Sequence, residues 1–110
     1  MSSTITVVKP VGVLDATQTD QLRSDIDDAL QSGASTVLID FENVSFMDSS
    51  GLGALVGAFK ALRAHGGKLC ICSINEQIRI LFELTSMDRV FDIFQNQEEF
   101  KRLAIANTTV

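Results

Sequence analysis

Residues 36–67 read TVLIDFENVSFMDSSGLGALVGAFKALRAHGG, and this stretch decides the fold class. It opens with an apolar run, 36–40, that is too short for a helix and is typical of a buried strand. After the polar segment MDSSG, apolar residues recur at helical spacing, which predicts a helix with one buried face. The face consists of Leu52, Leu55, Val56, Phe59 and Leu62. His65, Gly66 and Gly67 then predict the end of this helix.

Strand and helix signals alternate on both sides of this stretch. Apolar runs at 69–73 and 90–94 predict two more buried strands, and the extended segment around Pro10 predicts two short strands that pair as a hairpin at a sheet edge. Thr17 and Asp20 have the spacing of a capping box for a first helix, which Gly33 ends. Two later helices should begin near residues 76 and 97. The predicted fold class is therefore α/β, with a mixed but mostly parallel sheet, an N-terminal strand pair and about four helices.

The length of 110 residues fits a single domain over 1–110, in which we expect about 106–110 to form a frayed tail. The net charge of -5 and the scattered basic residues argue against nucleic acid as a partner. The N-terminus lacks the pattern of a secretory signal, and the longest apolar stretch is too short to span a bilayer. We therefore expect a cytoplasmic protein without a membrane partner.

The residues that usually carry catalysis are sparse. MDSSG does not fit the G-x-S-x-G pattern of a hydrolase, and His65 lies at the far end of a helix about 15 residues, or ~22 Å, long. Cys70 and Cys72 are best explained as small apolar side chains in a buried strand, because no histidine or third cysteine completes a zinc site. We expect no enzyme, no metal and no cofactor.

Two kinds of phosphate-related site fit the sequence poorly. SSGLG lacks the lysine of a phosphate-binding loop and the third glycine of a dinucleotide fingerprint, so nothing in the spacing requires a nucleotide. Asp40 ends a hydrophobic strand, as the phospho-accepting aspartate of response-regulator receivers does. By that family's pattern a receiver needs an acidic pair after the first strand and a late lysine. This sequence has a lone Asp15 and no lysine between Lys68 and Lys101, which disfavours a receiver.

The serine pair has a structural explanation that is compatible with a functional one. A serine oxygen can cap the following helix, and Ser50, which is closer to the helix, is the better candidate for the cap. Gly51 and Gly53 are not explained by a cap, since each glycine inside a helix costs ~0.5 to 1 kcal/mol relative to alanine. Either close packing on the sheet or the approach of another molecule must offset this cost. A phosphate on a serine here would add about -1.5 to -2 charges at a docking surface, which makes a binding switch.

The sequence from 37 to 71, with F-M-D-S-S-G-L-G at its centre and a glycine pair before the next strand, closely resembles the bacterial anti-sigma factor antagonists of the STAS domain family. The resemblance extends over nearly the whole chain. It implies that the protein binds an anti-sigma factor that is also a serine kinase, that this kinase phosphorylates Ser49 and thereby releases the antagonist, and that a PP2C-type phosphatase reverses the change. Asp15 matches the aspartate that ends the family motif G-E-L-D, in which Val13 replaces the glutamate.

The partner-binding residues that follow from this resemblance and from their position at the predicted strand ends are Asp15, Ser45, Phe46, Met47, Asp48, Ser50, Gly51, Leu52 and Gly53, with Ser73 and Asn75 as further candidates. Two other functions stay open at this point. One is an adaptor in a signalling complex that lacks a sigma factor, and the other is an accessory domain for small-molecule or lipid transport.

Overall fold

A computed structural model describes the backbone of residues 5–108 and the side chains of residues 5–103. Its centre is a four-stranded sheet in the order β1-β3-β5-β6, in which every pair of neighbouring strands is parallel. A second sheet consists of β2 and β4, which are also parallel to each other. The strands are β1 (Ile5–Val8), β2 (Gly12–Leu14), β3 (Thr36–Asp40), β4 (Val44–Met47), β5 (Lys68–Cys72) and β6 (Asp92–Phe94).

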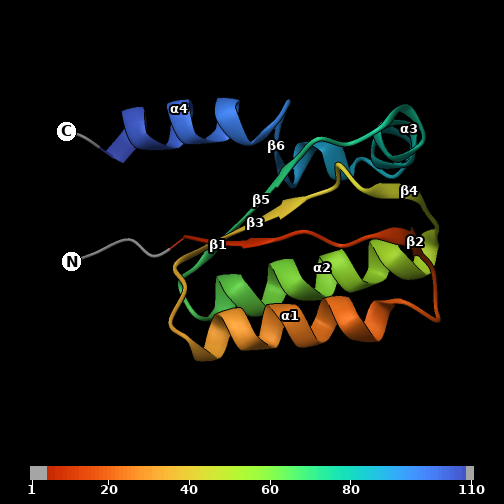
Figure 1. Cartoon of the computed structure of the whole chain (residues 1–110), viewed down its shortest axis with the longest axis horizontal. Coiled ribbons are helices and arrows are strands. Elements are labelled where there is room, and N and C mark those ends of the chain that lie inside the picture. Colours follow the sequence, from red (N-terminus) through yellow and green to blue (C-terminus); the bar gives the residue numbers. More distant parts are fainter. Residues whose placement is uncertain (1–4, 109–110) are drawn as a thin grey trace.

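Helices cover both faces of the main sheet. In Figure 1, α1 and α2 lie side by side below it, whereas α4 lies above it and α3 lies above its far end, near β4. The helices are α1 (Thr19–Gln31), α2 (Ser49–Ala64), α3 (Glu76–Leu84) and α4 (Gln97–Thr108), and a 3-10 turn, η1, spans Met87–Arg89. The two central strands are nearly continuous runs of buried residues, as expected for a sheet that is covered on both sides.

Two apolar clusters hold the layers together. The larger lies between the sheet and the helices α1, α2 and α3, and includes Leu22, Leu55 and Phe82. The smaller lies under α4, where Phe100 packs with Leu38 and both cysteines. The predicted α/β class and its four helices are confirmed. The sheet was expected to be mixed but mostly parallel, whereas the described strands form two sheets in which every pair is parallel. The predicted starts of α3 and α4 are confirmed as well, and Gly33 follows α1 with the positive φ of 83° expected after a helix end.

The predicted N-terminal hairpin is wrong. β1 and β2 both exist, but β1 pairs with β3 and β2 pairs with β4, so the two strands belong to different sheets. A hairpin needs antiparallel partners, and Pro10 lies where the chain passes from one sheet to the other. The sequence analysis did not predict the strand β4. This strand is short and its two central residues are exposed, so its segment lacks the run of apolar residues that indicates a buried strand.

Two boundaries also differ from expectation, and a third stays untested. The capping box of α1 is wrong: Gln18 precedes the helix and makes no side-chain cap, while the hydroxyl and amide of Thr17 donate to Asp15. The strand expected at 90–94 is shortened to β6, because residues 87–91 form η1 and a turn. The frayed tail at about 106–110 stays a prediction, since α4 is described to Thr108 and residues 109–110 lie outside the described part of the chain.

Candidate functional site

The start of α2 is capped by the aspartate and not by a serine, which corrects the expectation that Ser50 is the cap. Oδ1 of Asp48 accepts hydrogen bonds from the amides of Ser50, at 2.9 Å, and Gly51, at 3.2 Å. Asp48 has the extended backbone conformation of an N-cap residue. Since a carboxylate satisfies these amides, the cap needs neither serine hydroxyl.

Ser49 is the first residue of α2 and its side chain is exposed, whereas Ser50 is half-buried. Within residues 5–103, the hydroxyl of Ser49 makes no hydrogen bond. A group added to Oγ of Ser49 therefore breaks no hydrogen bond within the described part of the chain. The amides at the start of the helix also favour a nearby negative charge.

The two strands that lead to this turn are held in register. The amide of Asp48 donates to the carbonyl of Leu14 at 3.2 Å, so the end of β4 is tied to the end of β2. Gly51 packs directly on this junction: a Cβ at residue 51 would lie 2.5 Å from the carbonyl oxygen of Leu14 and 2.6 Å from Cγ of Met47. Close packing on the sheet is thus the reason for a glycine at 51. Close packing does not explain the glycine at 53, because a Cβ there would meet nothing within 4 Å.

The beginning of α3 fixes the other edge of β4. The side-chain amide of Gln77 makes a pair of hydrogen bonds with the backbone of Met47, accepting from its amide at 3.0 Å and donating to its carbonyl at 2.8 Å. The side-chain amide nitrogen of Asn75, Nδ2, donates to the carbonyls of Val44 and Ser45. Two side-chain amides therefore take the place of a third strand. Gln77 was missed in the sequence analysis, because nothing near it in the sequence points to residue 47.

An exposed apolar pair lies next to the capped turn, which consists of Asp48 and the first residues of α2. Val13 and Phe46 are Cα partners in the ladder between β2 and β4, and 39% and 45% of their surfaces are exposed. Val11, just before β2, is 70% exposed. The sequence analysis identified Phe46 but not Val13. The partnership of these two residues depends on a register shift between Gly12 and Val13 that the sequence does not reveal.

The predicted partner-binding residues divide by exposure. Phe46, Ser45 and Gly53 are exposed, and Asp15, Asp48 and Ser50 are partly exposed. The remaining three, Met47, Gly51 and Leu52, are buried and support the turn from beneath. Hydrogen bonds from the hydroxyl and the amide of Thr17 lower the pKa of Asp15, so its carboxylate is charged at neutral pH.

Ser73 and Asn75, the two further candidates, have other roles. Asn75 holds β4 and caps α3 by accepting from the amide of Ile78. Ser73 has a positive φ of 63° and belongs to a separate cluster around Asp40. In that cluster Asp40 is 2% exposed and accepts from Nε2 of Gln97 at 2.7 Å and from the amide of Glu42 at 2.9 Å.

The buried Asp40 is a structural carboxylate. Burial alone would raise its pKa, but the hydrogen bonds from Gln97, Glu42 and Ser73 outweigh burial and lower the pKa. Nζ of Lys9 approaches to 4.0 Å and adds a favourable charge. Because these contacts occupy its oxygens, the geometry agrees with the sequence argument against a receiver-like aspartate.

The other reactive side chains lie away from the turn. Cys70 and Cys72 are buried and unbridged, and burial raises the pKa of the Cys70 thiol to about 11, which leaves it protonated at neutral pH. His65 follows the last residue of α2, where its ring lies 2.8 Å from the carbonyl of Ala61. Among the described residues, no three acidic, histidine or cysteine side chains are grouped so that they could hold a metal ion. None of the helices in this part of the chain is both long and apolar enough to cross a membrane.

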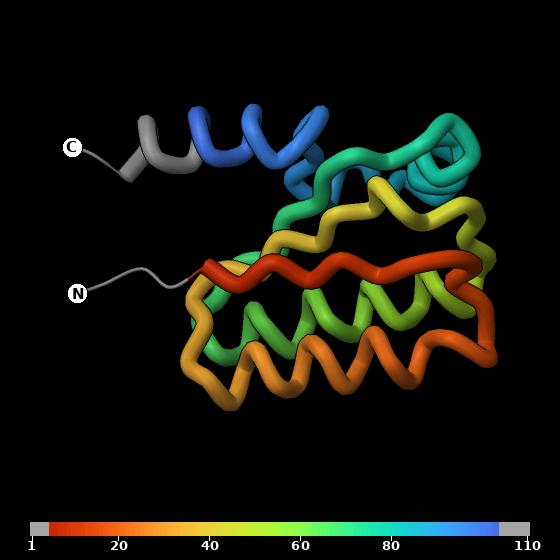
Figure 2. The backbone as a smooth tube through the Cα atoms, viewed as in Figure 1, coloured from red at the N-terminus to blue at the C-terminus, as the bar shows by residue number. Residues whose placement is uncertain are grey.

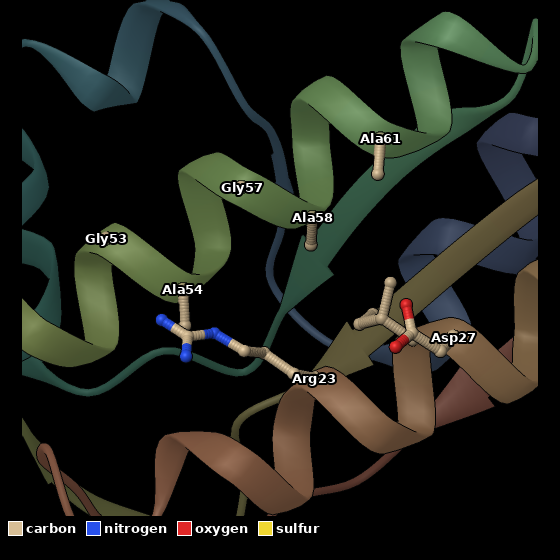
Figure 3. A pocket seen from close by; sticks show the side chains of 8 residues that line it. Arg23, Asp27, Gly53, Ala54, Gly57, Ala58 and Ala61 are labelled. Carbon is tan, nitrogen blue, oxygen red and sulfur yellow. The ribbon is translucent and has the colours of Figure 1, made fainter.

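A groove of about 240 Å³ lies between α1 and α2. Figure 3 shows Arg23 and Asp27 of α1 facing the small residues of α2 across this groove. The small residues are Gly53, Ala54, Gly57, Ala58 and Ala61. Gly53 lies one helical turn after Ser49 and therefore on the same side of α2.

Comparison with known proteins identifies relatives of this domain. The model of the STAS domain family matches residues 2–100. The anti-sigma F factor antagonist of Paenibacillus polymyxa is 29% identical over 94 residues, which cover 84% of this chain and 80% of that protein. The anti-sigma-B factor antagonist of Staphylococcus aureus is 34% identical over 91 residues, which cover 83% of this chain and 84% of that protein.

Solved structures agree with these relatives. The anti-sigma factor antagonist SpoIIAA in its unphosphorylated form is 26% identical, with a TM-score of 0.71 over 94% of this chain and 93% of that one. The phosphorylated form of SpoIIAA, a Bacillus cell fate determinant, is 27% identical, with a TM-score of 0.70 over 93% of both chains. This chain thus resembles both states of that protein to the same degree.

Proposed function

The chain belongs to the STAS domain family and is a homologue of the bacterial anti-sigma factor antagonists, and from this premise we propose that it is an antagonist controlled by phosphorylation of Ser49. Unphosphorylated, it binds an anti-sigma factor that is also a serine kinase. Phosphorylation by that kinase releases it, and a phosphatase of the PP2C type makes it competent to bind again.

The observation that carries this proposal is that Asp48, and not Ser49, caps the helix α2. Asp48 supplies the helix cap, so the exposed hydroxyl of Ser49 is available to a kinase without any loss of structure. In the transfer step, Oγ of Ser49 forms a bond to the γ-phosphorus of ATP, the bond to ADP breaks, and a base of the kinase accepts the hydroxyl proton. The acceptor chain contributes position alone.

The docking face that we propose consists of Asp15, Ser45, Phe46, Asp48, Ser49, Ser50 and Gly53, with the exposed Val13 added by the structure. Met47, Gly51 and Leu52 hold this face in place from the core side. Phe46 and Val13 supply apolar contact area, and aromatic residues such as Phe46 are enriched in the buried centres of interfaces. The exposed Gly53 lets a partner approach the helix backbone closely.

Phosphorylation acts on this face through charge. A phosphate on Ser49 carries about -1.5 to -2 charges and would be enclosed between two proteins next to Asp48. Leaving an unpaired charge in an interface costs several kcal/mol, and 2.8 kcal/mol already lowers affinity about a hundredfold. The helix dipole changes stability by only ~0.3 to 1 kcal/mol in the favourable direction. The phosphorylated domain therefore stays folded and loses its partner.

The isolated domain has no catalytic role in this proposal. Within the described residues Ser49 makes no hydrogen bond to a base, and His65 lies at the opposite end of the 16-residue helix α2. Cys70 is buried and protonated. Hydrolase and phosphotransfer assays on the purified chain should give background rates.

The experiment that tests the proposal is incubation with the candidate anti-sigma kinase and ATP, followed by mass spectrometry of the peptide 46–60. We expect one phosphate, on Ser49, which the PP2C-type phosphatase removes. Ser49→Ala should abolish labelling, and Ser50→Ala, the matched control one residue along, should keep it. Phosphate found mainly on Ser50, or normal labelling of Ser49→Ala, would show that the acceptor has been assigned wrongly.

A further inference from the structure

The main sheet has an open edge at β1. This strand stands at one end of the order β1-β3-β5-β6 and, within the described residues, pairs on one side only, with β3. Successive residues of a strand in a parallel ladder direct their backbone groups to opposite edges, so alternate residues of β1 present N–H and C=O groups outward. Such an edge is a template on which an extended segment of another protein can form one more strand.

A groove runs along this edge between β1 and α1. It has a volume of about 410 Å³ and is lined by Thr6, Val7, Val8 and Lys9 of the strand side and by Asp25, Asp28, Ala29 and Ser32 of α1. Figure 2 shows the red N-terminal segment, which begins with β1, running alongside α1. An added strand would therefore have the carboxylates of α1 below one of its faces.

The groove carries a negative charge that the described part of the chain does not neutralise. Asp25 accepts a hydrogen bond from Gln21 at 3.0 Å, but neither Asp25 nor Asp28 forms an ion pair within residues 5–103. The one cation on the groove wall, Lys9, is bound to Glu42 at 2.9 Å. The partner that complements this surface is consequently positive.

The opposite face of the edge is apolar. Ile5 and Val7 are 46% and 43% exposed. They lie on the α4 side of the sheet, because Val7 is the ladder partner of Leu38, which packs under Phe100. Side chains of a strand alternate between the two faces of its sheet. A strand added beside β1 would thus place every second side chain next to Ile5 and Val7 and the others over Asp25 and Asp28.

We propose that the outer edge of β1 is a docking site for an extended segment of a partner protein in which basic and apolar side chains alternate. Backbone pairing along β1 supplies the contact, and the two faces supply the selectivity. A second copy of this chain is a poor occupant. Pairing two β1 strands would bring the acidic α1 helices of both copies together, and each chain carries a net charge of -5.

The test uses the full chain and three labelled peptides whose cores read KVKVKV, KKKVVV and EVEVEV. We expect KVKVKV to bind more tightly than the other two by about tenfold or more, measured by fluorescence anisotropy at low salt. We also expect amide shifts in the NMR spectrum to centre on residues 5–9. Equal binding of the blocked peptide KKKVVV would mean that charge alone is recognised, and would overturn the proposal.

Charge-reversed variants separate the groove from the rest of α1. The double variant Asp25→Lys/Asp28→Lys should lose KVKVKV and gain EVEVEV. Its matched control is Asp20→Lys/Asp27→Lys, which changes the charge of the same helix by the same amount at residues that do not line this groove. Indistinguishable binding by the two double variants would contradict the proposal. Ser49→Asp should bind KVKVKV as the parent does, so failure of the phosphorylation switch and failure of this edge site can be told apart.

Discussion

Gly51 lies so close to Leu14 that a side chain at residue 51 has no room. A Cβ there would be 2.5 Å from the carbonyl oxygen of Leu14, the same oxygen that accepts a hydrogen bond from the amide of Asp48. This contact joins the small sheet of β2 and β4 to the first turn of α2. The position of Ser49 on the surface therefore depends on a glycine two residues later.

Gly51→Ala should destabilise the domain. Overpacking of a core costs about 1 to 3 kcal/mol, and the gain of ~0.5 to 1 kcal/mol from replacing a helical glycine by alanine offsets only part of it. The matched control is Gly53→Ala, which meets nothing within 4 Å and should raise the free energy of unfolding by that same ~0.5 to 1 kcal/mol. Urea unfolding measures both. A stable Gly51→Ala variant would mean that the junction can move apart at little cost.

Asp48→Ala should lower the free energy of unfolding by ~1 kcal/mol, because two amides at the start of α2 lose their acceptor. Ser50→Ala should change stability far less, since the serine hydroxyl does not cap the helix. The comparison can be made by thermal and urea unfolding of the two variants. Equal losses for both would show that Ser50 shares the cap in solution.

Ser49→Asp should weaken binding to the anti-sigma kinase strongly while the melting temperature stays within a few degrees of that of the parent. The reason is that the negative charge is tolerated at a helix start but not in an interface. Titration calorimetry and circular dichroism measure the two quantities. Normal kinase binding by this variant, or a loss of binding that merely accompanies unfolding, would contradict the switch mechanism.

Phe46→Ala should lower kinase affinity by at least about 2 kcal/mol, or roughly thirtyfold, if Phe46 anchors the docking face. Its stability should change little, because almost half of the side chain is already in water. Leu103→Ala on α4 removes an apolar side chain of similar exposure outside this face and serves as the control. Val13→Glu should weaken binding too. Parent-like affinity for both Phe46→Ala and Val13→Glu would exclude the apolar pair from the interface.

Asp40→Asn should lower the free energy of unfolding at pH 7 by about 1.5 to 3 kcal/mol. The asparagine oxygen can still accept from the Glu42 amide, but without a negative charge, and its NH2 group cannot accept from Nε2 of Gln97. The pKa of Asp40 is lowered on folding, so its ionised form stabilises the native state above the unfolded pKa, and this contribution disappears as the pH falls through the folded value. The difference between parent and variant should therefore be complete above about pH 5 and shrink below pH 4. Urea unfolding at several pH values checks this, and a difference that does not change with pH would contradict it.

The sequence by itself determined the layout of the domain. The apolar run at 36–40 indicates a buried strand, and the helical spacing of apolar residues after MDSSG indicates a helix with one buried face. Strand, helix and fold class therefore follow from the local sequence pattern. The family motif around Ser49 was likewise readable, because the aspartate, the serine pair and the helix start lie in one continuous stretch, whereas the exposure of Ser49 was shown by the structure.

Only the tertiary structure decided how distant segments meet. A parallel partner is chosen by contacts across many intervening residues, so the sequence could not show that β1 and β2 enter different sheets. The clamp of Gln77 on Met47 and the bond of Gln97 to Asp40 join residues 30 and 57 positions apart. Asp48 caps α2 because its carboxylate reaches the free amides of Ser50 and Gly51 at the helix start. Local propensity ranks possible partners, whereas packing selects among them.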